Sequence, residues 1–231
     1  MSQVNLVSDN LQAKFSKIDA YISDALLAPD AGLESALEAN HTAELDAIDV
    51  APNQGHLLYQ LAKLARARRI LEVGTLGGYS ALWLAKAVGP SGRVVTLELE
   101  ERHAEVARSN IKRAGFEDVV EVRVGPALDT LKELAASKEE PFDFVFIDAD
   151  KTNNVGYFKA GLELSHVGAV IIVDNIGRRG RLADLEVEDA SLRGTRQLFE
   201  YLKGEKRVEA TAVQTVGSKG WDGFLMATIV A

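Results

Sequence analysis

The sequence has no cysteine among its 231 residues, and no apolar run approaches the roughly 20 residues that span a bilayer. Without cysteine, a disulfide framework, a thiolate metal site and a thiol nucleophile are excluded. Any metal must therefore be held by oxygen or histidine ligands. The opening residues, MSQVNLVSDNLQAKF, lack the basic and then apolar pattern of a secretion signal, so we expect a cytoplasmic protein with no membrane partner.

Positive charge is scarce as well. The chain carries 26 Lys and Arg against 34 Asp and Glu, a net charge of −8, and no basic block interrupts the acidic balance. A nucleic-acid partner is not expected from such a composition. The histidines do not show the spacing of four that places two zinc ligands on one helix face; they are His41, His56, His103 and His166.

Apolar patterning predicts an α/β fold in a single domain, 1–231. Residues 5–28 repeat apolar groups every three to five positions, so we expect 1–50 to form a helical N-terminal extension. From Arg69 onward, short apolar strands alternate with longer helical patterns, which predicts a doubly wound, mostly parallel sheet covered by helices. The last two strand patterns, 207–216 and 223–231, are too close for a parallel crossover and should pair antiparallel.

A glycine-rich turn follows the first predicted strand, in LEVGTLGGYS. Its spacing differs from the dinucleotide-binding fingerprint, and Glu72 places a carboxylate where a pyrophosphate would be repelled. A cationic ligand such as S-adenosylmethionine fits better, with Glu72, Gly74 and Thr75 as contacts. Alternatively, Glu72 only caps or solvates the loop.

Two further strand ends carry candidate cofactor residues. Glu98 ends the second strand, roughly 20 residues beyond the glycines, where an acidic side chain accepts hydrogen bonds from ribose hydroxyls in nucleotide-binding α/β folds. Gly125 and Ala127 follow the third strand and could lie against an adenine face, although a plain turn explains the Gly-Pro pair equally well.

Oxygen ligands follow the fourth and fifth strands. FDFVFID ends in Asp148, and GAVIIVD delivers Asp174 and Asn175. Because carboxyl ends of neighbouring parallel strands meet at one edge, these groups should converge into a site for a hard divalent cation, Mg²⁺, Ca²⁺ or Mn²⁺. A single such aspartate would more simply be a helix cap or a ribose ligand.

Lys151 lies three residues beyond Asp148, close enough to share this site. A nearby cation disfavours the ammonium form of a lysine, which is what a lysine general base requires. The alternative is a surface lysine that pairs with Asp150, because exposed pairs of this kind are common and weak.

Taken together, these motifs resemble the cation-dependent O-methyltransferases, the family of catechol and caffeoyl-coenzyme A O-methyltransferases. The resemblance runs from about Val50 to the C-terminus and implies a seven-stranded Rossmann-like methyltransferase fold, a vicinal aromatic diol as acceptor and a homodimer. It implies metal ligation by Asp148, Asp174 and Asn175, and Lys151 as the base. The cofactor contacts that it implies are Val50, Glu72, Gly74, Thr75, Ser80, Glu98, Ala127 and Asp148.

The segment after the Asp-Asn pair departs from the pattern of caffeoyl-coenzyme A relatives, which often carry an aromatic residue where this chain has Arg178. Arg179 and Arg181 follow it. This cluster either recognises a carboxylate or phosphate on the acceptor or belongs to a solvated loop whose charge balances the acidic run LADLEVED. Trp221 and Asp222 either close over an aromatic acceptor or belong to the core or the hairpin.

The predicted reaction is methyl transfer from S-adenosylmethionine to one hydroxyl of a catechol-like acceptor. The cation would chelate both acceptor oxygens while Lys151 removes the proton. Two alternatives remain open: a metal-independent methyltransferase acting on nitrogen or a carboxylate, and a non-catalytic cofactor-binding module. An NAD-dependent dehydrogenase ranks last because the phosphate-binding spacing is absent.

Overall fold

A computed structural model describes residues 3–231 as one seven-stranded sheet with the strand order β3-β2-β1-β4-β5-β7-β6. Strands β1 to β5 are parallel, β7 pairs antiparallel with both β5 and β6, and β6 therefore runs in the same direction as the first five. The strands are β1 (Arg69–Val73), β2 (Arg93–Glu98), β3 (Val120–Val124), β4 (Phe142–Ile147), β5 (Ser165–Asp174), β6 (Val208–Gly217) and β7 (Gly220–Ile229).

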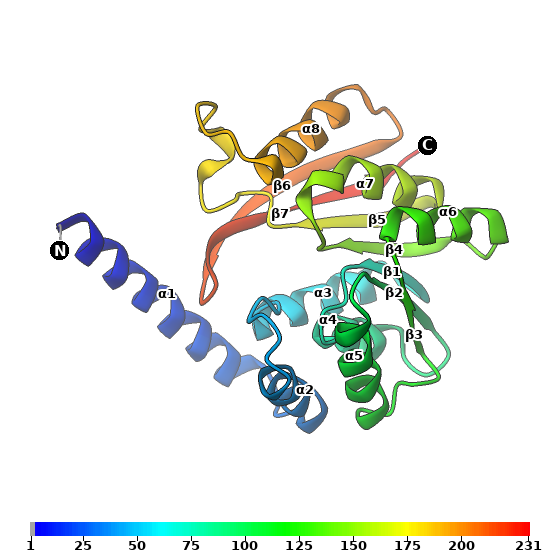
Figure 1. The fold of residues 1–231 in the computed structure, drawn as a ribbon, viewed down its shortest axis with the longest axis horizontal. Helices are drawn as coiled ribbons and strands as arrows, with labels where there is room; N and C mark the ends of the chain where they lie inside the picture. The colour runs from blue at the N-terminus through cyan, green and yellow to red at the C-terminus, as the bar shows by residue number, and fades with distance from the viewer. Residues whose placement is uncertain (1–2) are drawn as a thin grey trace.

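Helices cover both faces of this sheet (Figure 1). Helices α3, α4 and α5 lie on one side and α6, α7 and α8 on the other, while α1 extends away from the body of the molecule. The helices are α1 (Gln3–Leu26), α2 (Ala31–Thr42), α3 (Pro52–Leu64), α4 (Tyr79–Val88), α5 (Glu101–Arg113), α6 (Ala127–Ser137), α7 (Asn154–Glu163) and α8 (Ala190–Gly204), with short 3₁₀ turns η1 (Lys151–Asn153) and η2 (Arg181–Ala183).

The predicted strands and their parallel pairing are confirmed, and the doubly wound sheet follows from them. The C-terminal pair is antiparallel as predicted, but β7 begins at Gly220, earlier than the sequence pattern indicated. Trp221 and Asp222 belong to the strand, and only Ser218 and Lys219 form the turn. The predicted helical segment at the N-terminus is α1, followed by the separate helix α2.

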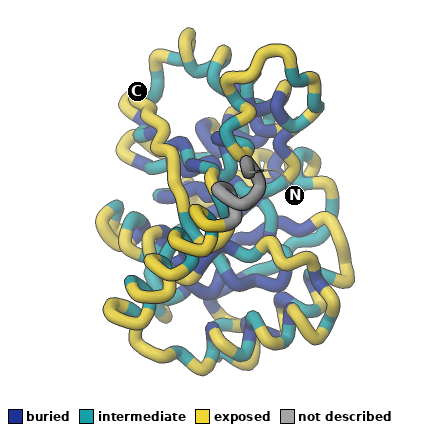
Figure 2. Tube along the Cα trace, turned by 90° about the vertical axis from the view of Figure 1, so that its left-hand side faces the viewer, coloured by how far each residue is buried: buried dark blue, intermediate teal, exposed yellow. Residues whose placement is uncertain are grey.

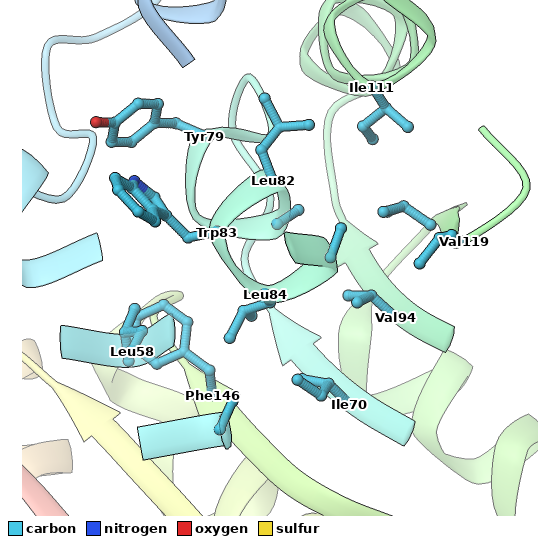
Figure 3. Packing of buried hydrophobic residues seen from close by; sticks show 14 of the residues in the cluster. Leu58, Ile70, Tyr79, Leu82, Trp83, Leu84, Val94, Ile111, Val119 and Phe146 are labelled. Carbon is cyan, nitrogen blue, oxygen red and sulfur yellow. The ribbon is translucent and has the colours of Figure 1, made fainter. Parts of the chain in front are cut away.

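Each face of the sheet has its own hydrophobic core. Alternate residues of β4 point to opposite faces, so Phe144 and Phe146 pack with α3 and α4, whereas Val145 and Ile147 pack beneath α6 and α7. Figure 3 shows Phe146 beside Leu58, with the aromatic rings of α4 close by. Fully burying a side chain of this size contributes about 1.5–3 kcal/mol. Figure 2 shows the buried chain at the centre and the exposed outer sides of the helices.

The strand register aligns the ends of four strands. Val73 pairs with Leu97 on one side and with Ile147 on the other, and Ile147 pairs with Val173. The residues that come directly after this row are Gly74, Glu98, Asp148 and Asp174. Strand order reverses between β1 and β4, which is where ligands bind in open parallel sheets. Within residues 3–231, the search for a membrane-crossing helix finds no segment of sufficient length and apolarity.

Candidate active site

The turn after β1 brings two strand ends into contact. Gly74 has a φ of +100°, and a Cβ atom placed there would lie 2.1 Å from the carbonyl oxygen of Asp148. Only glycine permits both this backbone conformation and this approach. The glycine turn therefore passes close to the backbone of Asp148, the residue that directly follows β4.

The carboxylate of Glu98 holds the same turn from the side of β2. One oxygen accepts hydrogen bonds from the backbone N–H groups of Thr75 (3.2 Å) and Leu76 (2.7 Å), and the other accepts from Leu99 (2.9 Å) and Glu100 (3.0 Å). Four donors satisfy the about four lone-pair sites of a carboxylate. This bracing role was not predicted from the sequence, and ribose hydroxyls would have to share these acceptor sites.

Glu72 lies below the floor of the site, where it is fully buried in β1. One of its oxygens accepts a hydrogen bond from the Thr96 hydroxyl at 2.6 Å, and the other is buried without a partner in the described chain. Burial raises the pKa of Glu72 to about 7, and the charges of Asp148 and Glu98 add to the shift while the Thr96 bond opposes it. Both sequence interpretations of Glu72 need correction, because the side chain neither lines the cavity nor reaches solvent.

A cavity of about 630 Å³ opens above the glycine turn. Except for Glu72 and Gly125, every residue predicted to contact the cofactor lines it: Val50, Gly74, Thr75, Ser80, Glu98, Ala127 and Asp148. The sequence analysis missed further lining residues, among them Tyr79, Leu99, His103, Leu128 and Tyr157. These residues come from helices and loops beside the strand ends, and their spacing in the sequence carries no recognisable motif.

Asp150 also lines this cavity, in a role different from the expected one. Its carboxylate accepts hydrogen bonds from the hydroxyls of Thr152 and Tyr157 and from the Asn153 amide. Burial alone would raise the pKa of Asp150, but these hydrogen bonds lower it. Asp150 is thus held ionised at the cavity wall and is not the ion-pair partner of Lys151.

Lys151 is buried, with 7% of its side chain exposed, and its Nζ lies 2.7 Å from Oδ1 of Asp148. The alternative of a surface lysine is therefore wrong. Helix α8 packs closely over this turn, since a Cβ on Gly194 would lie 2.1 Å from the Lys151 carbonyl oxygen. The close packing fixes the lysine on the inner side of η1, facing the end of β4.

Asp174 ends β5 beside this ion pair and is almost fully buried. Its Oδ2 accepts a hydrogen bond from Gln54 Nε2 at 2.6 Å, and its Oδ1 accepts from the backbone of Asn175 at 2.7 Å. Burial, and next the charge of Asp148, raise the pKa of Asp174, while Lys151 opposes the shift. Gln54 comes from α3 and was not predicted, because nothing in the local sequence relates it to a strand end 120 residues away.

A second cavity, of about 650 Å³, adjoins the first. Asp148, Asn175 and Arg178 line both cavities, whereas Gln54 and Asp174 line only the second. The predicted ligand oxygens of Asp148, Asp174 and Asn175 therefore face one space, as the strand order requires. Asn175 has a φ of +57°, a conformation that asparagine tolerates better than most residues.

The donor set of this second cavity fits a hard cation. Two carboxylates and one amide oxygen are the ligands that Mg²⁺, Ca²⁺ and Mn²⁺ prefer, with water or substrate completing the coordination. Burial, and next the charge of Asp148, raise the pKa of Asp174, and a bound cation would favour its ionised form. Within the described residues, no group of three or more His, Cys, Asp or Glu side chains is arranged for a metal, so the amide of Asn175 is needed to complete the set.

The remaining candidates lie outside the two cavities or at their border. His56 packs against Tyr59 and Trp83, with ring centroids 5.5 Å apart in each pair. Trp221 lines neither cavity, and its indole N–H donates to Gln214 at 3.0 Å, so the hairpin interpretation is the correct one. Asp222 lines the second cavity.

Comparison with known proteins adds to this geometry. Residues 30–226 match the family model described as O-methyltransferase. The catechol O-methyltransferase of Mycobacterium tuberculosis is 50% identical over 92% of this chain and 94% of that protein. The crystal structure of an O-methyltransferase from Bacillus cereus in complex with SAH superimposes with a TM-score of 0.93 at 51% identity, covering 94% of this chain and 99% of that one. The crystal structure of an O-methyltransferase from Streptomyces achromogenes, involved in tomaymycin synthesis and bound to SAM, superimposes with a TM-score of 0.92 at 44% identity. The match covers 95% of this chain and 99% of that one.

Proposed function

Because this chain belongs to the S-adenosylmethionine-dependent O-methyltransferase family, we propose that it methylates one hydroxyl of a vicinal aromatic diol with the help of a divalent cation. The acceptor class and the need for a cation are the proposal. Relatives named catechol O-methyltransferase, at 50% and 42% identity, support it.

One observation carries the proposal: Asp148 borders both cavities and forms an ion pair with the buried Lys151. A group that takes a proton from an acceptor must lie within hydrogen-bond reach of the acceptor hydroxyl, beside the line along which its oxygen attacks the methyl donor. The end of β4 is the place where the two cavities meet, and it holds the one buried lysine of the described chain. The pair therefore lies where a hydroxyl would lose its proton before attack.

We assign the first cavity to the cofactor, which supplies the methyl group when bound. Gly74 and Thr75 would offer backbone to its amino-acid end, and Val50 and Ser80 would close that side. Glu98 would accept from the ribose, next to the Thr75 N–H that it already binds. Ala127 would lie against the adenine, near the ionised Asp150.

We assign the second cavity to the acceptor. Asp148, Asp174 and Asn175 would hold the cation, which when bound supplies positive charge that favours the ionised acceptor hydroxyl and orients both oxygens. Gln54 keeps the Asp174 carboxylate in one orientation by its hydrogen bond.

Lys151 Nζ is the atom to which we assign the acceptor proton. Oδ1 of Asp148 lies 2.7 Å from this Nζ. With Asp148 also serving as a cation ligand, Lys151 would accept the acceptor proton as a neutral amine. The oxygen anion would then attack the methyl carbon in line, since both partners are held in adjoining cavities.

The test is to incubate the protein with S-adenosylmethionine and a panel of catechols and monophenols, with Mg²⁺ or with EDTA, and to quantify S-adenosylhomocysteine and methylated product. We expect product from catechols only, and only with the cation. Full activity in EDTA would favour the metal-independent alternative, in which Asp148 and Asp174 only position the substrate. Methylation of monophenols at the same rate would remove the diol from the proposal.

We also infer a homodimer, supported by apolar side chains that face solvent on the extended helix α1. Ile18 is 57% exposed and Tyr21 77%. The neighbouring strand β6 forms the edge of the sheet and carries exposed Val213 and Val216. An exposed apolar edge of this kind is normally covered by another chain. Sedimentation equilibrium should give twice the 25.0 kDa chain mass, and a monomer at working concentrations would contradict the inference.

A further inference from the structure

We propose that the acceptor carries an anionic group, a carboxylate or a phosphate, which Arg179, Arg181 and Lys219 hold in the second cavity, beside Arg178. The inference rests on the proposed function for the diol end of the acceptor and adds what lies at its other end.

Four basic side chains line the second cavity, and none has an acidic partner. Across the described chain, no carboxylate forms an ion pair with Arg178, Arg179, Arg181 or Lys219. Lys219 Nζ donates to the Ala47 carbonyl at 3.0 Å, and Arg178 donates to the Ser191 hydroxyl at 3.1 Å, with its Nε buried and unpaired. In a chain with a net charge of −8, such a concentration of unpaired cations needs a cause.

The four cations and the carboxylates of Asp148 and Asp174 reach this cavity from different segments of the chain. The arginines come from the segment after β5, and Lys219 comes from the turn between β6 and β7. Asp148 and Asp174, in contrast, come directly from strand ends. A ligand with a diol at one end and an anion at the other matches this distribution of charge.

The other two carboxylates that line the cavity form no ion pair with the cations. Asp49 accepts a hydrogen bond from the Asn40 amide at 2.8 Å, burial raises its pKa, and Lys219 opposes that shift only through space. Asp222 accepts from the backbone N–H groups of Gly177 (2.8 Å) and Arg178 (3.0 Å). Asp49 therefore binds an amide and Asp222 binds backbone N–H groups, and neither forms an ion pair with the four basic side chains.

The segment that carries the arginines is held in a defined shape. Arg178 and Arg179 have φ values of +51° and +57°, which cost about 1 kcal/mol or more each for residues other than glycine. Gly180 lets the chain pass the Trp221 ring, because a Cβ there would lie 2.6 Å from the ring. Arg196 of α8 donates to backbone carbonyls of Leu182 and Val187 in the same segment. Such strain and bracing are typical of a binding site.

The acidic run after the arginines forms no ion pair with them. Glu188 pairs with Arg193, at 3.4 Å. Asp189 caps α8, where hydrogen bonds from Ser191 and Leu192 lower its pKa and Arg181 acts on it only through space. Figure 1 shows this yellow segment beside α8, between the end of β5 and the helix that its carboxylates cap. Within the described residues, no ion pair therefore joins this acidic run to the arginines, two of which, Arg179 and Arg181, are exposed.

The experiment compares catechols that differ only in the group at the far end: a carboxylate, a phosphonate, the neutral primary amide and a cationic aminomethyl group. The ratio of kcat/KM for an anionic acceptor to that for the amide is the readout. We expect a ratio of about 10 or more in the wild-type enzyme, falling with added salt. The carboxylate and phosphonate arms identify which anion the site prefers.

The variants are Arg179→Gln, Arg181→Gln and Lys219→Gln, with Lys132→Gln on the exposed side of α6 as the control. We expect each of the first three to lower the ratio about threefold to tenfold, and the control to leave it unchanged. Equal thermal unfolding and equal binding of S-adenosylhomocysteine establish that the variants are folded. A wild-type ratio near one, or variants that leave the ratio unchanged, would overturn the inference.

Direct binding separates this inference from the proposed function. Calorimetric titration of benzoate and phenylphosphonate into the complex with S-adenosylhomocysteine requires no methyl transfer. Anion binding that is lost in the three variants, together with no methylation of any catechol, would retain the anion site and reject the diol acceptor. Catechol methylation without any charge preference would retain the proposed function and reject the anion site, and failure of both would reject both.

Discussion

The side-chain amide of Gln54, on α3, donates to the buried carboxylate of Asp174 at the end of β5, 2.6 Å away. The other Asp174 oxygen is bound to backbone, so both oxygens have fixed partners. Residues that orient a metal ligand in this way tune its affinity for the ion. The helix before the sheet therefore contributes directly to the geometry of the site.

Replacing Gln54 with leucine should raise the Mg²⁺ concentration needed for half-maximal activity by about tenfold or more, because the carboxylate loses its orienting donor. Activity measured against Mg²⁺ concentration tests this. Gln60→Leu is the matched control, since Gln60 lies on the same helix and is exposed. Equal Mg²⁺ curves for Gln54→Leu and wild type would show that the hydrogen bond only packs the helix.

Lys151→Gln should lower kcat by about 10²-fold to 10⁴-fold, which is the usual contribution of a general base. Binding of S-adenosylmethionine is measured separately, because Lys151 also lines the cavity that we assign to the cofactor. Rapid-quench kinetics separate the chemical step from binding. A Lys151→Gln enzyme with wild-type kcat at neutral pH would remove the lysine from the reaction.

Glu72 should make the protein less stable as the pH rises. The pKa of its carboxyl is 4.5 in the unfolded chain and about 7 in the folded protein, so the folded state binds more protons between these two pH values. Stability then falls from pH 4.5 to pH 7 and does not recover above it, by about 2–3 kcal/mol in total. Thermal unfolding of Glu72→Gln and wild type should diverge in favour of the variant by several degrees between pH 5 and pH 8. A constant difference across this range would show that Glu72 is ionised when folded.

Gly74→Ala should lower the free energy of unfolding by about 3 kcal/mol or more. The new Cβ would collide with the Asp148 carbonyl oxygen, and the φ at this position is unfavourable for alanine. Gly89→Ala is the control: its φ is +69°, but no atom lies within 4 Å of the added Cβ, so about 1 kcal/mol is expected. Urea unfolding of both variants measures the difference. Similar losses would mean that β1 and β4 can separate without penalty.

The sequence predicted the sheet well because its central strands are continuous apolar runs that end abruptly in polar residues. FDFVFID and GAVIIVD carry that signal, and both strands were found where they were expected. The hairpin was less predictable. Gly220 interrupts the strand pattern locally, yet β7 begins there because it pairs with Gly217 across a tight turn. Tertiary pairing overrides local preference at such positions.

The site was predictable where chemistry follows a strand end and unpredictable elsewhere. Asp148, Asp174 and Asn175 converge because parallel strands share an edge. Gln54 and Tyr157 lie near them because helices α3 and α7 bring them there, and the sequences of these helices indicate only how the helices pack. Glu72 shows the opposite error: its position beside the glycine turn indicated a ligand contact, but strand alternation turns its side chain into the interior.

The braced segment after β5 divides the molecule into parts that selection can change separately. Three residues that we assign to the cofactor or the cation, Gly74, Glu98 and Asp148, lie at the central strand ends, where the register fixes them together. The arginines and Lys219 lie outside that register, on one loop and one turn. Mutations there leave the sheet intact, so descendants of this chain can acquire new acceptors while the transfer chemistry is inherited unchanged.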